Sequence, residues 1–175
     1  MPKKPFVLQF EPAELPGYAV QYSYKRDPAA AIAAGDAAAQ DRRYTRDGVL
    51  AVIKWKAARA NTRLEPDEDV VKATTHAALT TADETLRMDR LTELDGVGVP
   101  IASALLFFTE PTRYPMLDRR AVRSLGHAPR GKYPTEFWVR YLTFCRQLAN
   151  DHGLTMRELD KALWEYDHQQ NPGQC

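Results

Sequence analysis

The chain has 175 residues, a mass of 19.8 kDa and a formal net charge of +1, with 44% hydrophobic and 27% charged residues. These values are typical of one globular domain, or of two small lobes in one chain, and exclude disorder throughout. The longest apolar run, Ile101 to Phe108, is far shorter than the roughly 20 residues that span a bilayer, so we expect no membrane partner. The nearly neutral charge argues against a protein that coats nucleic acid by bulk charge.

The cysteines and histidines predict neither a disulfide framework nor a metal site. Cys145 falls in a helical pattern and Cys175 is the last residue of the sequence, a usage typical of a reducing cytoplasm. No Cys-x-x-Cys pair is present to build a zinc ribbon or a four-cysteine iron–sulfur cluster. The histidines lack the spacing of metal ligands: they are His76, His127, His152 and His168. We therefore expect a cytoplasmic protein without a side-chain metal site.

The first 26 residues contain four prolines, and we expect at most a short strand over Phe6 to Phe10, with loop around it. Beyond them, capping residues and apolar periodicity predict helices almost throughout. About eight are expected, over residues 28–40, 45–60, 66–79, 81–94, 100–108, 118–126, 134–153 and 155–168. The predicted fold class is therefore all-α.

Local signals define several of these helices. Thr81 with Glu84, and Thr155 with Glu158, match the capping box that opens a helix. The run from Ile101 to Phe108 is apolar on all sides, so its helix must be buried.

A short glycine-containing segment, Asp95-Gly-Val-Gly-Val-Pro100, separates two predicted helices. Gly96 and Gly98 permit a tight turn and let a phosphate approach the backbone without a Cβ in the way. The first amides of the helix that follows can bind an anion as well. Two interpretations remain open at this point: a phosphate-binding hairpin and a plain corner between two helices.

Basic residues are concentrated just beyond this hairpin. Residues 111–132 hold six basic side chains and one acidic side chain, Asp118, which gives a local charge of +5. This asymmetry indicates either an edge that faces phosphates or a solvated helix face. The basic residues are Arg113, Arg119, Arg120, Arg123, Arg130 and Lys132.

The stretch from Leu91 to Ala102 resembles the helix-hairpin-helix of the HhH-GPD superfamily of DNA glycosylases, whose pattern is roughly Leu-x-x-Leu-x-Gly-Val-Gly-x-x-x-Ala. That family places a catalytic aspartate further along the chain, after an extended Pro-rich stretch. Asp118 follows Tyr114-Pro-Met-Leu117 here, and its distance from the hairpin matches the family's spacing. The resemblance covers about a quarter of the chain.

The chain departs from the family at several positions. Bifunctional members carry a Schiff-base lysine where this chain has Pro100, so the resemblance implies a monofunctional enzyme. Arg120 replaces a histidine that often follows the aspartate, and the iron–sulfur cysteines of one branch are missing. The chain is also shorter than most members.

The resemblance implies two small helical lobes around a cleft, with residues 27–118 in one lobe and residues 1–26 and 119–175 in the other. The hairpin at 95–100 would bind DNA, and a K⁺ or Na⁺ ion on its carbonyls is a property of some members. The residues expected to contact DNA are Gly96, Gly98, Val99, Pro100, Arg119, Arg120, Arg123, Lys54 and Lys56.

Asp118 would stabilise the sugar cation that forms as the base departs. The alternative is that Asp118 only caps a helix, which contributes ~1 kcal/mol without any catalysis. Trp55 and Tyr114 are the main candidates for stacking on a flipped base, and core packing is the alternative for each. The remaining aromatic candidates are Tyr44, Trp138 and Trp164. No catalytic role is predicted for Glu158 or Asp160.

The leading hypothesis is a DNA glycosylase of base-excision repair, without strong lyase activity, whose partner is double-stranded DNA. In a bacterium it would associate with the nucleoid. The rival hypothesis is a helix-hairpin-helix protein that binds DNA without excising a base. A third is an all-α interaction module in which the hairpin is only a corner.

Overall fold

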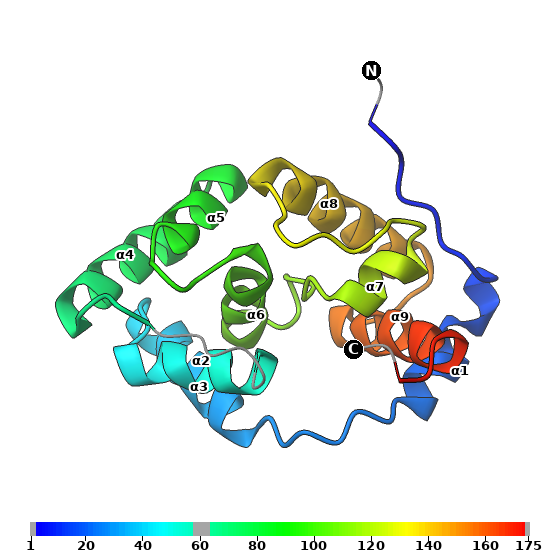
Figure 1. Cartoon of the computed structure of the whole chain (residues 1–175), viewed down its shortest axis with the longest axis horizontal. Coiled ribbons are helices and arrows are strands. Elements are labelled where there is room, and N and C mark those ends of the chain that lie inside the picture. The colour runs from blue at the N-terminus through cyan, green and yellow to red at the C-terminus, as the bar shows by residue number, and fades with distance from the viewer. Residues whose placement is uncertain (1–2, 58–63, 174–175) are drawn as a thin grey trace.

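The computed structural model describes residues 3–57 and 64–173, and within these ranges all regular structure is helical (Figure 1). The all-α prediction is thus confirmed for this part of the chain. A 3-10 turn (Pro12–Glu14) precedes α1 (Leu15–Gln21), α2 (Ala29–Asp41), α3 (Arg46–Lys56), α4 (Glu68–Thr80), α5 (Glu84–Thr92), α6 (Val99–Thr109), α7 (Arg119–Ser124), α8 (Thr135–Asp151) and α9 (Met156–Gln170). Positions 58–60, expected to end a helix, and Cys175 lie outside the described residues.

Most helix starts follow the capping chemistry of the sequence. The side chains of Thr45, Asp67 and Asp118 each accept a hydrogen bond from a backbone N–H in the first turn of the helix that follows. The predicted capping box of Thr155 and Glu158 is present at the start of α9. The box predicted for Thr81 and Glu84 is wrong, because the next aspartate is the cap of α5.

Asp83 takes that role by accepting hydrogen bonds from the N–H groups of Thr85 and Leu86. Glu84 is thereby left free to pair with the Arg87, Arg113 and Arg146 side chains.

The amino-terminal segment differs from expectation in two ways. Phe6 to Phe10 forms no strand, although the Val7 and Gln9 N–H groups donate to carbonyls at the end of α7. A sheet needs a strand partner, and here the partner is a helix terminus. The expected loop also contains α1, because Pro16 occupies the first turn, where a missing N–H costs nothing.

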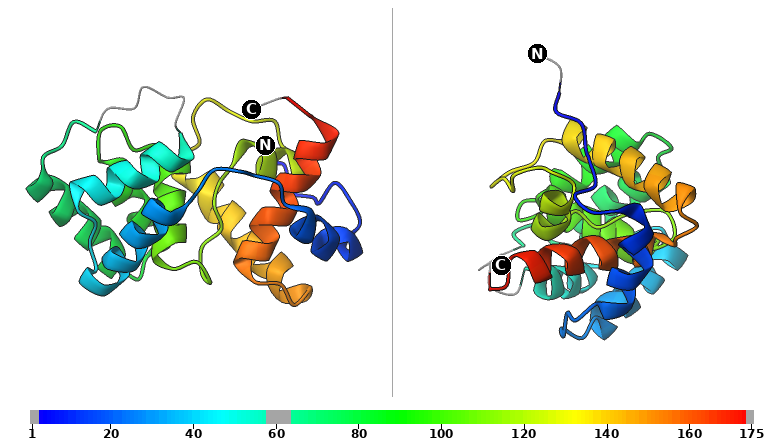
Figure 2. Two further views of the ribbon diagram at one scale, coloured as in Figure 1. Left: turned by 90° about the horizontal axis from the view of Figure 1, so that it is seen from below. Right: turned by 90° about the vertical axis from the view of Figure 1, so that its right-hand side faces the viewer.

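The helices contact one another in two sets. Helices α2, α3, α4 and α5 pack around the apolar helix α6 or beside one another, whereas α1, α7 and α8 pack against α9. Figures 1 and 2 show α2–α5 towards one side of the molecule and α1, α8 and α9 towards the other. Contacts between α5 and α8 join the sets. In the described ranges, no helix is both long and apolar enough to cross a membrane.

Two chain segments cross between the sets. Residues 22–28 run from α1 to α2 along one edge of the molecule (Figure 1). Ser23 on this segment donates from its N–H and its hydroxyl to Glu165 of α9, and the Arg26 guanidinium donates to the Trp55 carbonyl of α3. The second segment, residues 114–118, leads from α6 to α7 and carries Asp118.

Candidate functional site

The segment before Asp118 is held by three helices. The Leu117 N–H donates to the Ser103 hydroxyl of α6 at 2.9 Å, and the Met116 N–H donates to both carboxyl oxygens of Asp160 on α9, at 3.1 and 3.2 Å. The Tyr141 hydroxyl of α8 donates to the Met116 carbonyl at 3.0 Å. An extended segment has no hydrogen bonds of its own, so these side chains fix it and thereby position Asp118.

Asp118 combines a helix cap with an ion pair. Its Oδ1 accepts from the Arg120 N–H at 2.8 Å, and its Oδ2 lies 3.0 Å from the Lys56 ammonium. The Asp118 side chain is 31% exposed and that of Lys56 is 10% exposed. Burial acts to raise the pKa of Asp118, but Lys56 and the Arg120 N–H outweigh it, so the pKa lies below its usual value. The carboxyl group is therefore charged at neutral pH.

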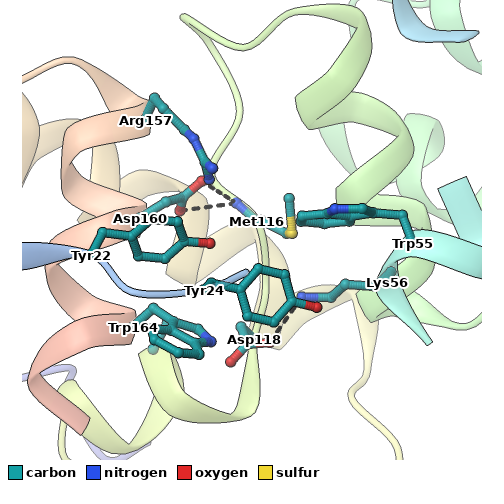
Figure 3. A pocket seen from close by; sticks show the side chains of 10 residues that line it. Tyr22, Tyr24, Trp55, Lys56, Met116, Asp118, Arg157, Asp160 and Trp164 are labelled. Carbon is teal, nitrogen blue, oxygen red and sulfur yellow. Dashed lines mark hydrogen bonds and ion pairs between the residues drawn. The ribbon is translucent and has the colours of Figure 1, made fainter. Parts of the chain in front are cut away.

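A small aromatic cavity, here called the inner pocket, lies beside Asp118 (Figure 3). Residues from α3, α7, α9, the 22–28 segment and the 114–118 segment line it. Its volume of about 50 Å³ accommodates a few water molecules but no nucleobase. Its lining is Tyr22, Tyr24, Trp55, Lys56, Met116, Asp118, Ala121, Arg157, Asp160 and Trp164.

Asp160 places a second carboxyl group in the inner pocket. Burial raises the pKa of Asp160 to about 7, outweighing the Arg157 guanidinium and the Met116 N–H, which act to lower it. One pocket thus holds a charged carboxylate and a carboxyl group that is half protonated near neutral pH. Such a pair can divide base and acid roles between its members.

A second cavity, here called the outer cavity, also borders the Lys56–Asp118 pair. Its volume is about 450 Å³, within the range of small-molecule sites. Lys56 and Asp118 border both cavities. The remaining lining is Ala57, Gly98, Pro100, Ile101, Leu117, Arg119, Arg130, Gly131 and Tyr133.

The hairpin between α5 and α6 borders the outer cavity at Gly98 and Pro100. Gly96 has φ of 90°, a conformation that favours glycine. Gly98 has φ of −86°, and a Cβ there would meet nothing closer than Pro100 Cδ at 3.8 Å. As the N-cap of α6, Gly98 provides no side-chain cap, so the first amides of α6 stay available to a ligand. The Val99 side chain is buried, so this residue offers only its backbone.

The three arginines predicted to hold phosphates have different environments. Arg119 is exposed and lines the outer cavity. Arg120 is 4% exposed and pairs with Asp167 at 2.9 Å, and Arg123 donates to both oxygens of the same carboxylate. The phosphate-binding prediction is therefore corrected for Arg120, which is buried in the helix packing and neutralises a buried acid. Arg123 pairs with the same acid, but its side chain is 21% exposed, so its DNA contact stays a prediction.

The aromatic candidates also divide between core and cavity. Trp55 and Trp164 line the inner pocket, where Tyr24 contacts both in edge-to-face geometry. Tyr114 is fully buried and donates its hydroxyl to Glu84, which corrects its assignment as a base-stacking residue. Tyr44 and Trp138 are fully buried as well. Within the Lys-Trp-Lys stretch, Lys54 is exposed and Lys56 turns towards Asp118.

Sequence reasoning missed Asp160, Tyr24 and Arg157. Asp160 occupies the buried face of α9, one turn after Met156 and one turn before Leu163. The signal in the sequence was that Asp160 falls at a position of the helix where the apolar pattern calls for a hydrophobic residue. In residues 3–57 and 64–173 there is no cluster of three or more acidic, histidine or cysteine side chains able to hold a metal.

No protein-family model, no curated protein and no solved structure matches the chain.

Proposed function

We propose that the chain is a DNA glycosylase that flips a damaged nucleotide out of the duplex and excises its base, with a helix-hairpin-helix contact to the backbone. One observation carries this proposal: the outer cavity is bordered both by Asp118 and by the Gly98–Pro100 end of the hairpin. A phosphate bound at the α6 amides would therefore lie beside the cavity that reaches the charged carboxylate. The two sets of packed helices support the two-lobed arrangement that the resemblance implies.

The chemistry follows from the charge of Asp118. Cleavage of the N-glycosidic bond sends its electron pair to the base and leaves positive charge on the sugar. The carboxylate of Asp118 stabilises this cation, and a water molecule that adds to the anomeric carbon gives its proton to the same carboxylate. The flipped nucleotide occupies the outer cavity, since the inner pocket is too small for it.

The absence of an amine at Pro100 supports a monofunctional reaction, because proline cannot form the covalent imine of a lyase. Trapping of the protein on an abasic duplex by borohydride would contradict this part of the proposal. A K⁺ or Na⁺ ion at the hairpin and a location at the nucleoid remain expectations of the resemblance.

A second candidate function, DNA binding without excision, is favoured by a specific observation. Lys56 already neutralises the Asp118 carboxylate, and the inner pocket beside it has only about 50 Å³. In that case the hairpin and Arg119 would hold a duplex without chemistry at Asp118.

Base release separates the two functions. Duplexes that each carry one alkylated purine, oxidised guanine or uracil are incubated with the wild type, with Asp118→Asn and with Asp83→Asn. Both substitutions replace an aspartate N-cap by an equally good cap. The glycosylase proposal predicts release by the wild type and Asp83→Asn, and loss of about 100-fold or more in Asp118→Asn. Unchanged release by Asp118→Asn refutes the catalytic assignment, and binding without any release favours the second candidate.

A further inference from the structure

A basic groove is lined by residues of the amino-terminal arm, of the start of α8 and of the loop that joins α7 to α8. Figure 1 shows where these three chain segments run. The volume of the groove is about 190 Å³. Four cationic side chains and one carboxylate line it, which leaves a surplus of three positive charges. The lining is Lys3, Lys4, His127, Arg130, Pro134, Glu136, Phe137 and Arg140. We call it the α7–α8 groove.

The two arginines of the α7–α8 groove are oriented without being neutralised. The Arg130 guanidinium lies over the Phe137 ring, 5.6 Å from its centroid, and the Arg140 guanidinium lies over the Phe6 ring at 5.5 Å. Arg140 also donates to the Lys4 carbonyl. Aromatic faces and carbonyls hold a guanidinium in place and leave its charge for another partner.

Other arginines of the chain contrast with this pair. Arg120 and Arg123 share the Asp167 carboxylate, and Arg113 pairs with two glutamates. Within the described ranges, Arg130 and Arg140 form no ion pair with any carboxylate, and Glu136 pairs with Lys3 instead. The groove therefore presents two oriented guanidinium groups that lack an anion.

The pKa of His127 reflects the positive charge in the groove. The His127 ring is buried, and Nε2 lies 3.0 Å from the Pro5 carbonyl. Burial lowers the pKa of His127. Lys4, Arg140 and Arg130 lower it further because their positive charges repel a proton on the imidazole ring. The positive field of the groove thus comes from lysine and arginine.

Arg130 lines both this groove and the outer cavity, so the two are neighbours along the surface. Arg119 and the Gly98–Pro100 end of the hairpin border the outer cavity, and the amino-terminal lysines border the groove, so phosphate-binding groups lie in both of the cavities that share Arg130. A phosphodiester backbone carries regularly spaced anions and can bind in both cavities at once, whereas a single small anion would occupy only one of them.

We propose that the α7–α8 groove is a second phosphate-binding site, which takes the sugar–phosphate backbone of the duplex flanking the nucleotide held at the outer cavity. The site rests on the proposed DNA-binding function and adds contacts by Arg130, Arg140 and the amino-terminal lysines. These contacts fix the position of the duplex and carry no base specificity.

The test is the salt dependence of binding to a fluorescent duplex of about 20 base pairs, with KCl between about 50 and about 200 mM. Arg130→Gln and Arg140→Gln are compared with the wild type and with Arg43→Gln, an exposed arginine between α2 and α3. The slope of log K against log[KCl] is negative, and each lost phosphate contact reduces its magnitude by about 0.9. We expect this decrease, with several-fold weaker binding than the wild type, in both groove variants but not in the control.

Equal slopes and affinities in all four proteins would overturn the second site while leaving the DNA-binding proposal intact. A wild type that binds no duplex would overturn both. Arg130→Lys keeps the charge, so it should retain most of the slope that Arg130→Gln loses. If it loses as much as the glutamine variant, the charge of Arg130 is not the cause and the proposal fails.

Discussion

The ammonium of Lys56 lies 3.0 Å from Oδ2 of Asp118, which joins the end of α3 to the start of α7 at the boundary between the inner pocket and the outer cavity. The pair lowers the pKa of Asp118, together with the Arg120 N–H, against the burial that acts to raise it. Lys56 was predicted to contact DNA, but in the structure its ammonium pairs with the Asp118 carboxylate. The lowered pKa of Asp118 therefore has one of its causes in a residue that is 62 positions away in the sequence.

Substitution of Lys56 is expected to raise the pKa of Asp118. Lys56→Gln removes the neighbouring positive charge, so burial of the carboxyl group is less well compensated. The measurement is the carboxyl ¹³C chemical shift of Asp118 as a function of pH. Lys54→Gln is the matched control, because Lys54 is an exposed lysine of the same helix. An unchanged titration in Lys56→Gln, or an equal change in both variants, would show that the ion pair does not set this pKa.

Asp160 is expected to make stability fall as pH rises towards neutrality. Its folded-state pKa of about 7 lies above the value of about 4 in an unfolded chain. Between these values the unfolded chain releases a proton that the folded chain retains, so the free energy of unfolding decreases with rising pH. Asp160→Asn cannot titrate, and its carbonyl can still accept from the Met116 N–H. Its stability relative to the wild type should therefore rise across this window, by on the order of 4 kcal/mol at most.

Urea unfolding of both proteins at several pH values measures this difference. Glu158→Gln serves as the control on the same helix. The pKa of Glu158 is lowered by its hydrogen bonds with Thr155. The contribution of Glu158 to folding stability is therefore lost only in acid, as the pH falls through its lowered pKa. A wild-type-to-Asp160→Asn difference that stays constant from about pH 4 to about pH 7 would refute the raised pKa.

The hairpin can be tested without disturbing the fold. At Gly98 the backbone is in an ordinary region and a Cβ has space, so Gly98→Glu should fold normally. Its carboxylate would repel a phosphate at the α6 amides, and we expect duplex affinity to fall about tenfold or more. Gly17→Glu makes the same charge change in α1, where the nearest contact is 4.0 Å away. Equal affinity of the two variants would show that the hairpin binds no phosphate and is only a corner between two helices.

The Asp167 carboxylate is predicted to stabilise the fold rather than to affect DNA binding. Asp167→Asn leaves Arg120 and Arg123 without their counter-ion, and removal of one partner from a buried ion pair costs about 3 kcal/mol. Glu93→Gln breaks only an exposed pair with Arg90 and should cost less than about 1 kcal/mol. Denaturant unfolding measures both. Similar small losses in the two variants would mean that Asp167 does not neutralise the arginines.

The elements that sequence analysis predicted are those with local signals. Thr45, Asp67 and Thr155 mark helix starts through contacts within a few residues of themselves, and the Asp118 cap belongs to this group. Helix α1 escaped prediction because proline breaks a helix interior but suits its first turn, and a sequence does not show which of the two applies.

The site depends on contacts between distant positions, which sequence periodicity does not show. Asp160 lies on the buried side of α9, and only the fold shows that the Met116 N–H and the inner pocket meet it there. Arg120 and Arg123 give α7 a basic sequence, but their partner Asp167 is 47 and 44 positions away from them along the chain. The net charge of this sequence segment therefore overestimated the number of basic side chains that are available to bind phosphates.

The most direct test of the DNA-binding account compares two duplexes that differ at one position. The affinity of the wild type for a duplex with a stable abasic-site analogue is measured beside its affinity for the intact duplex, at low and at moderate KCl. A glycosylase that holds a flipped, base-less sugar at the Asp118 edge of the outer cavity should prefer the abasic duplex, and the affinity should fall with salt. Salt-dependent binding without preference would contradict the excision proposal, and no binding to either duplex would contradict the DNA-binding account as a whole.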